Sequence, residues 1–232
     1  MAEIPKSSRR LKHYLETAFK EENWREYFNN VLKQVDRGII PAMFHLLYNK
    51  DELVKWRAVT AFGIYTRFIG ESDSVKLNNV IRRCVWMLTE ESGGIAWGVP
   101  EAMGEMLANS EELTQSHASI LMSHIFDNPD GSDNYLEHEP LRFGVIWAVS
   151  RLAEVYPEYI RNDKHIIEQL CEIETTDRCI ALVCRIIGQI KLESKKEYLE
   201  KHSKNPAEIS LYINKQLKNY RVKDIAMEQL VK

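Results

Sequence analysis

Small residues recur inside apolar helical stretches of this chain, and this recurrence most constrains the fold. Four such positions align at steps of 41, 46 and 38 residues: Gly63, Gly104, Ser150 and Gly188. Small side chains let two helix backbones approach each other closely. A helix pair that returns about every 40–47 residues is typical of a stack with one continuous core. The spacing therefore predicts a solenoid of helix pairs, with the last step slightly short.

Apolar residues return every three or four positions along most of the chain, which is the period of an amphipathic helix. The pattern begins in residues 11–19 and continues in 27–35. Glycine and proline are sparse, at 10 and 7 residues, and no long run alternates with the period of two that strands show. The chain is therefore predicted to be all-α.

A proline followed by a spaced set of Asp, Val and Arg marks residues 41–58. The set is Pro41, Asp51, Val54, Arg57 and Ala58. It resembles the HEAT repeat, in which a proline marks the first helix and the other residues surround the start of the second. Arg142 and Arg178 resemble the same arginine position. The resemblance covers roughly residues 39–192. One unit departs from the pattern, since Gly98-Val99-Pro100 stands where the HEAT repeat has a basic residue.

The resemblance implies an all-α, right-handed α-α superhelix of about four to five helix pairs, an armadillo-type α-solenoid. The chain is also similar to small uncharacterised prokaryotic HEAT-like proteins of the PBS-lyase-HEAT-like kind. We predict one solenoid domain over residues 1–232, with cap helices in 1–38, repeats in 39–192 and a helical cap in 193–232. Solenoids need polar end units for solubility. Within the last cap we expect a helix from Pro206 to about Tyr220.

Composition and charge exclude some classes of protein. Hydrophobic residues make up 44% and charged residues 28%, as in an ordinary soluble domain. The N-terminus has no apolar core of a secretory signal, and no run approaches the ~18 apolar residues of a membrane span. We expect a cytoplasmic protein that does not insert into a membrane. The net charge of −3 argues against nucleic acid, whose binders carry a basic stripe.

The acidic residues are concentrated in the middle of the chain. From Thr89 to Pro140 there is no Lys or Arg, and eleven acids give this stretch a formal charge of −11. We predict an acidic concave groove centred on residues 90–140. Its partner would be a protein with a basic segment, or a small cationic ligand. A solvated acidic face without a partner is the alternative.

We expect the binding site next to Gly93-Gly94, at the mouth of this groove. Trp97 would form an aromatic wall and nearby glutamates the anionic contacts. Arginines of neighbouring repeats would pair with these acids or with a ligand carboxylate; the alternative is a structural ladder with Asp51 and other acids. The predicted binding residues are Trp56, Arg57, Glu91, Trp97, Glu101, Glu105, Arg142 and Trp147.

Metal sites find little support in the sequence. The four cysteines, of which none forms a C-x-x-C pair, lie in apolar stretches and are expected to be reduced core residues. A thiolate site from Cys171, Cys179 and Cys184 is the alternative, although the last two point to different helix faces. The loop Asp127–Glu137 resembles a calcium loop, but Phe126 occupies the first ligand position. A looser cation site in this loop stays open.

No GxSxG, HExxH or catalytic cysteine motif is present. The single His-Glu pair, His138-Glu139, cannot supply the dinuclear site of deoxyhypusine hydroxylase, a HEAT-repeat enzyme. We predict a non-enzymatic protein-interaction scaffold without catalytic residues, metal or cofactor. The alternative is a HEAT-like enzyme or small-molecule binder in the style of phycobilin lyases or DNA glycosylases, although the acidic centre opposes DNA.

Overall fold

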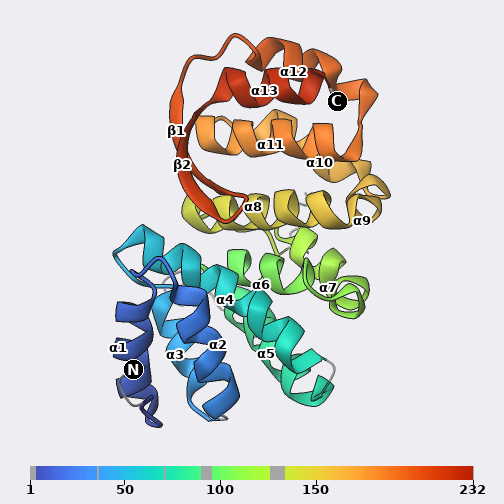
Figure 1. Cartoon of the computed structure of the whole chain (residues 1–232). Helices are drawn as coiled ribbons and strands as arrows, with labels where there is room; N and C mark the ends of the chain where they lie inside the picture. The colour runs from blue at the N-terminus through green and yellow to red at the C-terminus, as the bar shows by residue number, and fades with distance from the viewer. Residues whose placement is uncertain (1–3, 36, 71, 90–95, 126–133, 232) are drawn as a thin grey trace. The chain divides into compact units, whose positions relative to one another are not determined.

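A computed structural model of the chain describes residues 4–35, 37–70, 72–89, 96–125 and 134–231. In these ranges the chain forms thirteen α-helices and one two-stranded sheet (Figure 1). Its contacts group into two compact units, Met1–Ser110 and Glu111–Lys232. No helix in the described ranges has both the length and the apolar character needed to cross a membrane. The assignment of one domain to the whole chain stays a prediction.

The first unit is built from helices alone within its described residues. They are α1 (Ser8–Ala18), α2 (Trp24–Gln34), α3 (Ile39–Leu46), α4 (Glu52–Gly70), α5 (Ser74–Thr89) and α6 (Val99–Leu107). The long helix α4 packs against α6, and α1 packs against α3. Asp51 starts α4 by accepting hydrogen bonds from the backbone N–H groups of Leu53 and Val54, at 3.0 and 3.4 Å.

Two glycines of this unit lie where a side chain would not fit. A Cβ on Gly63 of α4 would lie 2.6 Å from Nδ2 of Asn109 and 2.8 Å from Cγ of Glu105. Gly98 has a φ of +73°, and a Cβ there would lie 2.9 Å from that of Leu47. The small residue predicted to bring helices together is thus confirmed at Gly63. The departure from the HEAT pattern at Gly98 has a steric and conformational cause.

The second unit has helices on both sides of a hairpin in its sequence. Its elements are α7 (Glu111–Ser123), α8 (Glu139–Val155), α9 (Pro157–Arg161), α10 (Lys164–Ile173), α11 (Asp177–Ile190), a 3₁₀ turn (Glu193–Lys195), α12 (Lys196–His202), β1 (Glu208–Ile213), β2 (Gln216–Arg221) and α13 (Val222–Leu230). Helix α11 packs against both α8 and α13. Every residue from Cys179 to Cys184 is buried, so α11 is the centre of the core of this unit.

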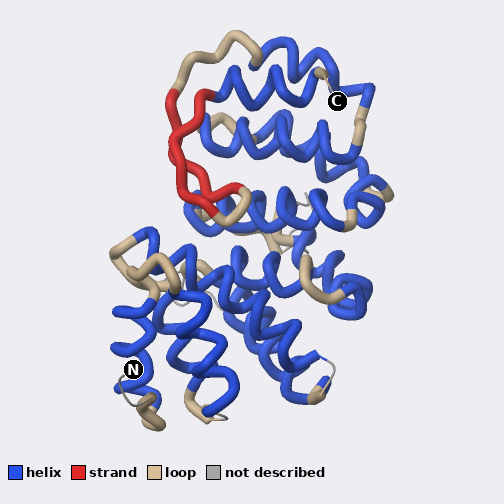
Figure 2. Tube along the Cα trace, in the orientation of Figure 1, coloured by secondary structure: helices blue, strands red, loops and turns tan. Residues whose placement is uncertain are grey.

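The helix predicted from Pro206 to about Tyr220 is wrong, because this segment forms the hairpin β1–β2 (Figure 2). The strands are antiparallel, and Ile213 pairs with Gln216 across a two-residue turn. Asn214 and Lys215 have φ values of +53° and +61°, as such tight hairpin turns require. Isoleucine and tyrosine in β1 favour an extended chain that packs one face on a core.

Candidate functional site

The structure corrects the role predicted for Glu101 and Glu105. Both lie on α6, whose nine residues are all buried, and they are 2% and 3% exposed. The ammonium group of Lys55 lies 3.0 Å from Oε1 of Glu101. Asn109 donates through Nδ2 to the backbone oxygen of Glu105 at 2.7 Å and to its Oε1 at 3.3 Å. These carboxylates are therefore buried and make contacts within the first unit, whereas the prediction requires them to be exposed.

Arg57 serves the packing of the first unit. Its Nη1 donates to the backbone oxygens of Phe19 and Glu21, both at 2.7 Å, and its guanidinium lies 5.8 Å from the ring centre of Trp24. The arginine at the start of the second repeat helix thus fixes the turn between α1 and α2. The described cation next to Glu101 is Lys55, at 3.0 Å, and the pairing of Arg57 with these acids or with a ligand carboxylate stays a prediction.

Arg142 has a similar position and a similar role in the second unit. It donates through Nη1 to the backbone oxygens of Leu136 and Glu137, at 3.1 and 3.0 Å. Its Nε donates to Glu174, whose side chain is 2% exposed. Both arginines therefore make structural contacts: Arg142 pairs with an acid, as the alternative of a structural ladder predicts, and Arg57 bonds to the backbone of the turn between α1 and α2.

The tryptophans predicted to bind a partner divide into two kinds. Trp56 and Trp147 are each 4% exposed and belong to the core of their units. Trp147 donates through Nε1 to the backbone oxygen of Tyr212 in β1, at 2.8 Å. Trp97 is 50% exposed, and its role as a binding residue stays a prediction. Glu91 lies outside the described residues, as do residues 90–95 and 126–133 of the acidic stretch and most of the Asp127–Glu137 loop.

Part of the acidic stretch is exposed in the second unit, next to aromatic residues that the sequence did not single out. We name this the tyrosine–glutamate surface; its residues are Glu111, Glu112, Tyr156, Glu158 and Tyr159. The three glutamates are exposed and the two tyrosines half-buried. The rings of Tyr156 and Tyr159 meet edge to face, with centres 6.2 Å apart.

The electrostatics of this surface are negative. Partial burial raises the pKa of the Tyr156 hydroxyl, and the charges of Glu111 and Glu158 raise it further. Two carboxylates from different helices, α7 and α9, therefore act on one phenol. Sequence reasoning missed this arrangement because Glu111 and Glu158 are 47 positions apart in the chain. The packing of α7 and α9 on α8 brings both near Tyr156.

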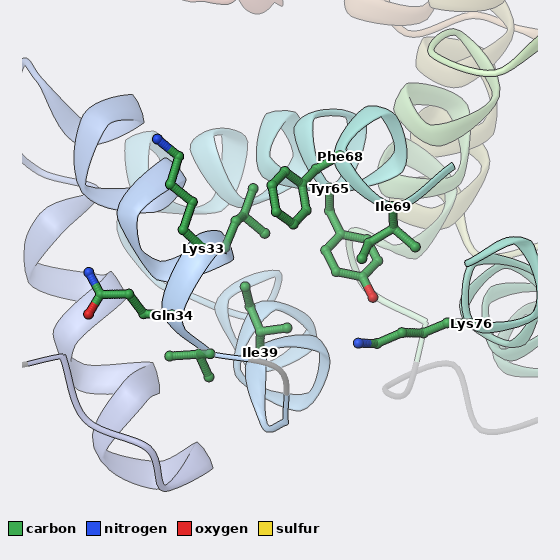
Figure 3. A pocket seen from close by; sticks show the side chains of 9 residues that line it. Lys33, Gln34, Ile39, Tyr65, Phe68, Ile69 and Lys76 are labelled. Carbon is green, nitrogen blue, oxygen red and sulfur yellow. The ribbon is translucent and has the colours of Figure 1, made fainter. Parts of the chain in front are cut away.

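A cavity of about 170 Å³ lies in the first unit, between the ends of α2 and α4 and the starts of α3 and α5 (Figure 3). Its apolar lining is Leu32, Val35, Ile39, Tyr65, Phe68 and Ile69. Lys33, Gln34 and Lys76 complete the lining. No sequence motif predicts this cavity, because its lining residues come from the ends and starts of four helices and from Val35, which follows α2.

The cysteines lie in the core or at its edge, as the sequence predicts. All four are free; three are buried and Cys171 is partly buried. Among the residues that the structure describes, no group of three or more His, Cys, Asp or Glu side chains could hold a metal ion. The alternative of a site from Cys171, Cys179 and Cys184 is therefore wrong.

Sequence comparisons with known proteins assign this chain to no family. No family model matches the chain. An uncharacterised protein of Archaeoglobus fulgidus is 23% identical over 124 residues, which are 53% of this chain and 61% of that protein. The match thus spans less than two thirds of the length of this relative.

Solved structures resemble the chain over almost its whole length. A designed armadillo repeat protein matches with a TM-score of 0.55 at 15% identity, over 96% of this chain and 93% of its own. An engineered protein matches with 0.59 at 12% identity, over 96% and 90%. A designed armadillo repeat protein in complex with the peptide (KR)4 matches with 0.57 at 15% identity, over 96% and 92%.

Identities this low show the fold alone. They confirm the prediction of a HEAT- or armadillo-like stack of helix pairs, which the hairpin β1–β2 interrupts near its end. The chain has the fold of an armadillo-type α-solenoid.

Proposed function

We propose that this chain is a binding scaffold that holds a protein segment rich in Lys and Arg against the tyrosine–glutamate surface. The observation that carries the proposal is the edge-to-face pair of Tyr156 and Tyr159 beside exposed glutamates, of which Glu111 and Glu158 act electrostatically on Tyr156. Carboxylates attract ammonium and guanidinium groups, and the faces of tyrosine rings attract them as well. Of the acidic groove predicted over residues 90–140, this proposal keeps the exposed glutamates of α7 and adds Glu158 of α9.

The magnitudes indicate a partner with several cations. An exposed ion pair contributes about 0.2–1 kcal/mol and an exposed cation–π contact about 0.5–1 kcal/mol. A single Lys or Arg therefore binds too weakly to matter, whereas a segment with several of them engages both carboxylates and both rings. Such binding weakens as salt rises, because exposed charges are screened.

Two solved neighbours support a peptide segment as the partner of this scaffold. One is a designed armadillo repeat protein in complex with the peptide (KR)4, and another was designed for modular peptide recognition. They share the fold with this chain at 14–15% identity, so the argument from them concerns the scaffold. The charge of the ligand is argued from Glu111, Glu112 and Glu158.

Fluorescence polarisation with a labelled (KR)4 peptide tests the proposal. We expect binding at low salt that is lost at high salt, and weaker binding by the Glu111→Gln/Glu158→Gln variant. A matched control is Glu22→Gln/Glu26→Gln, which removes two exposed charges from the first unit. Equal binding by the wild type and the Glu111→Gln/Glu158→Gln variant would exclude this surface as the site.

A further inference from the structure

Four cations and no acid lie between Lys6 and Lys12, where the sequence reads KSSRRLK. We name residues 6–12 the basic segment. Lys6, Arg9 and Arg10 are exposed, and Lys12 is partly exposed. None of the four side chains forms an ion pair or a hydrogen bond with another described residue. These four charges therefore have no counter-charge in contact within the described part of the chain.

The basic segment runs into the first turn of α1, which contains Arg9 and Arg10 and no acid. A helix dipole disfavours positive charge at the start of the helix, so a carboxylate from outside would stabilise this turn. Leu11 and Leu15 are fully buried and fix α1 to the unit. The helix packs against α3 and α2, and Figure 1 shows it at the edge of the first unit. The cations are thus held in place where a partner can reach them.

A hollow of about 350 Å³ continues the positive surface beyond Lys12. Its lining consists of Lys12, Glu16, His45, Tyr48, Asn49 and Lys50. The acid among them, Glu16, accepts a hydrogen bond from Nδ2 of Asn49 at 2.7 Å. Lys12 and Lys50 both reach the hollow beside Tyr48, which is 38% exposed. The hollow therefore offers two ammonium groups and an aromatic ring to the glutamate and tyrosine side chains of a partner.

The tyrosine–glutamate surface of the second unit has the opposite charge and the same kind of aromatic residue. It combines three exposed glutamates with two tyrosines whose rings meet edge to face. The chain has another basic run without an acid, residues 215–223. That run matches the glutamates less well, because Arg221 already pairs with Asp224 at 2.7 Å. The basic segment is therefore the better counterpart within this sequence.

We propose that the basic partner of the tyrosine–glutamate surface is the basic segment of a second copy of this chain. This inference rests on the proposed function and names its partner. The glutamates of one copy pair with Arg9 and Arg10 of the next, and Lys12 and Lys50 extend the contact. Because the two surfaces differ, the contact is head to tail. Each pair of copies then retains one free surface of each kind, so association continues beyond a dimer.

Sedimentation velocity of the full chain over a range of concentrations tests the proposal. We expect a weight-average mass that rises with concentration at low salt and returns to that of the monomer at high salt, because exposed ion pairs are screened. Arg9→Glu/Arg10→Glu and Glu111→Lys/Glu158→Lys should each weaken the association about tenfold or more. A wild-type chain that is monomeric at every concentration overturns the proposal, as does an Arg9→Glu/Arg10→Glu variant that associates like the wild type.

Mixing the two charge-reversed variants locates the contact. One variant then carries two basic surfaces and the other two acidic ones, so the equimolar mixture should associate although neither variant does so alone. A mixture that stays monomeric overturns the proposal. Arg37→Glu/Arg67→Glu is the matched control, since it reverses two exposed arginines of the first unit outside the basic segment. It should associate as the wild type does. Circular dichroism verifies that the variants are folded, and Arg9→Gln/Arg10→Gln serves where a reversed variant is not.

The (KR)4 peptide separates this inference from the proposed function. A peptide that binds the tyrosine–glutamate surface should compete with the basic segment and dissociate the assemblies; assemblies that persist at saturating peptide overturn the inference. Peptide binding that depends on Glu111 and Glu158, by a chain that remains monomeric, overturns the self-association and leaves the proposed function intact. Equal peptide binding by the wild type and the Glu111→Gln/Glu158→Gln variant contradicts the proposed function itself.

Discussion

Arg142 of α8 donates through Nε to Oε1 of Glu174, which follows α10, at 2.5 Å. The reverse pair joins the same two repeats: Arg178 of α11 donates to both carboxylate oxygens of Glu139, which begins α8, at 2.8 Å each. The starts of α8 and α11 thus exchange arginine–glutamate pairs. The two pairs differ in burial, and that difference sets what each contributes to stability.

We predict that Glu174→Gln destabilises the chain by about 3–5 kcal/mol, because it leaves the guanidinium of a partly buried Arg142 without its charged partner. Glu139→Gln should cost less than about 1 kcal/mol, since Glu139 and Arg178 have side chains 33% and 39% exposed. Urea unfolding measures both. Equal losses in the two variants would show that burial does not decide the strength of these pairs.

Trp147→Phe should destabilise the second unit by about 1–3 kcal/mol, because it removes the indole N–H that donates to the buried backbone oxygen of Tyr212. Hydrogen exchange should show faster exchange in β1 and β2 than in α11. Trp86→Phe is the control: this exposed residue should change stability by less than about 0.5 kcal/mol.

Gly63→Ala should destabilise the first unit by about 1–3 kcal/mol, since the added methyl group meets Asn109 and Glu105 at less than 3 Å. Gly70→Ala, on the same helix, meets only Leu77, at 3.7 Å. That control should be neutral or stabilising by up to about 1 kcal/mol. Thermal unfolding distinguishes them, and a stabilised Gly63→Ala variant would contradict the packing of α4 on α6.

The stability of the chain should fall in mild acid because of His124. Burial lowers the pKa of this fully buried imidazole, although a contact of 2.8 Å from Nδ1 to the backbone oxygen of Asn134 opposes the shift. The unfolded chain takes up a proton near pH 6.5, where the folded chain does not, so stability is lost as pH falls from about 6.5 toward the lower folded pKa.

Urea midpoints at about pH 7.5 and pH 5.5 measure this effect. In His124→Asn the difference between the two midpoints should shrink. It should not vanish, because burial lowers the pKa of His202 as well, which gives a loss in the same direction. An unchanged difference in the variant would show that His124 does not titrate on unfolding.

Alkylation of the cysteines should follow their burial. Burial raises the pKa of Cys84, Cys179 and Cys184 to about 12 and that of Cys171 to about 11. The thiolate is the reactive form, so all four should react slowly with iodoacetamide in the native chain, and Cys171 first. Mass spectrometry after short labelling gives the order; early modification of Cys84 would contradict it.

The sequence predicts the fold well because the packing signals are local. Helical periodicity and the recurring small residues follow directly from how helices bury one face, and Gly63 fulfils that role. The hairpin was missed because its signal is weak: the turn residues are Asn214-Lys215, without glycine, and β2 carries only Leu217 and Tyr220 as larger apolar side chains. A lysine-rich segment that follows a long series of helices is easily taken for one more helix.

The site could not be predicted in the same way. Glu101 and Glu105 have the spacing of an exposed acidic face, but the packing of α4 against α6 buries that face, and Lys55 and Asn109 satisfy it. Charge in a sequence does not say which side of a helix reaches solvent. The surfaces that remain exposed, at Tyr156 and Phe68, are assembled from helices whose contact depends on the whole unit.

The hairpin also has a consequence for the way the second unit folds. In an ideal repeat array each repeat contacts only the adjacent repeats, so the repeats can unfold one after another from the ends. Here the indole of Trp147 contacts Tyr212, 65 residues later in the chain. This long-range hydrogen bond raises the contact order and couples the hairpin to α8. The unit should therefore lose its C-terminal helix only together with α8, in a single cooperative transition.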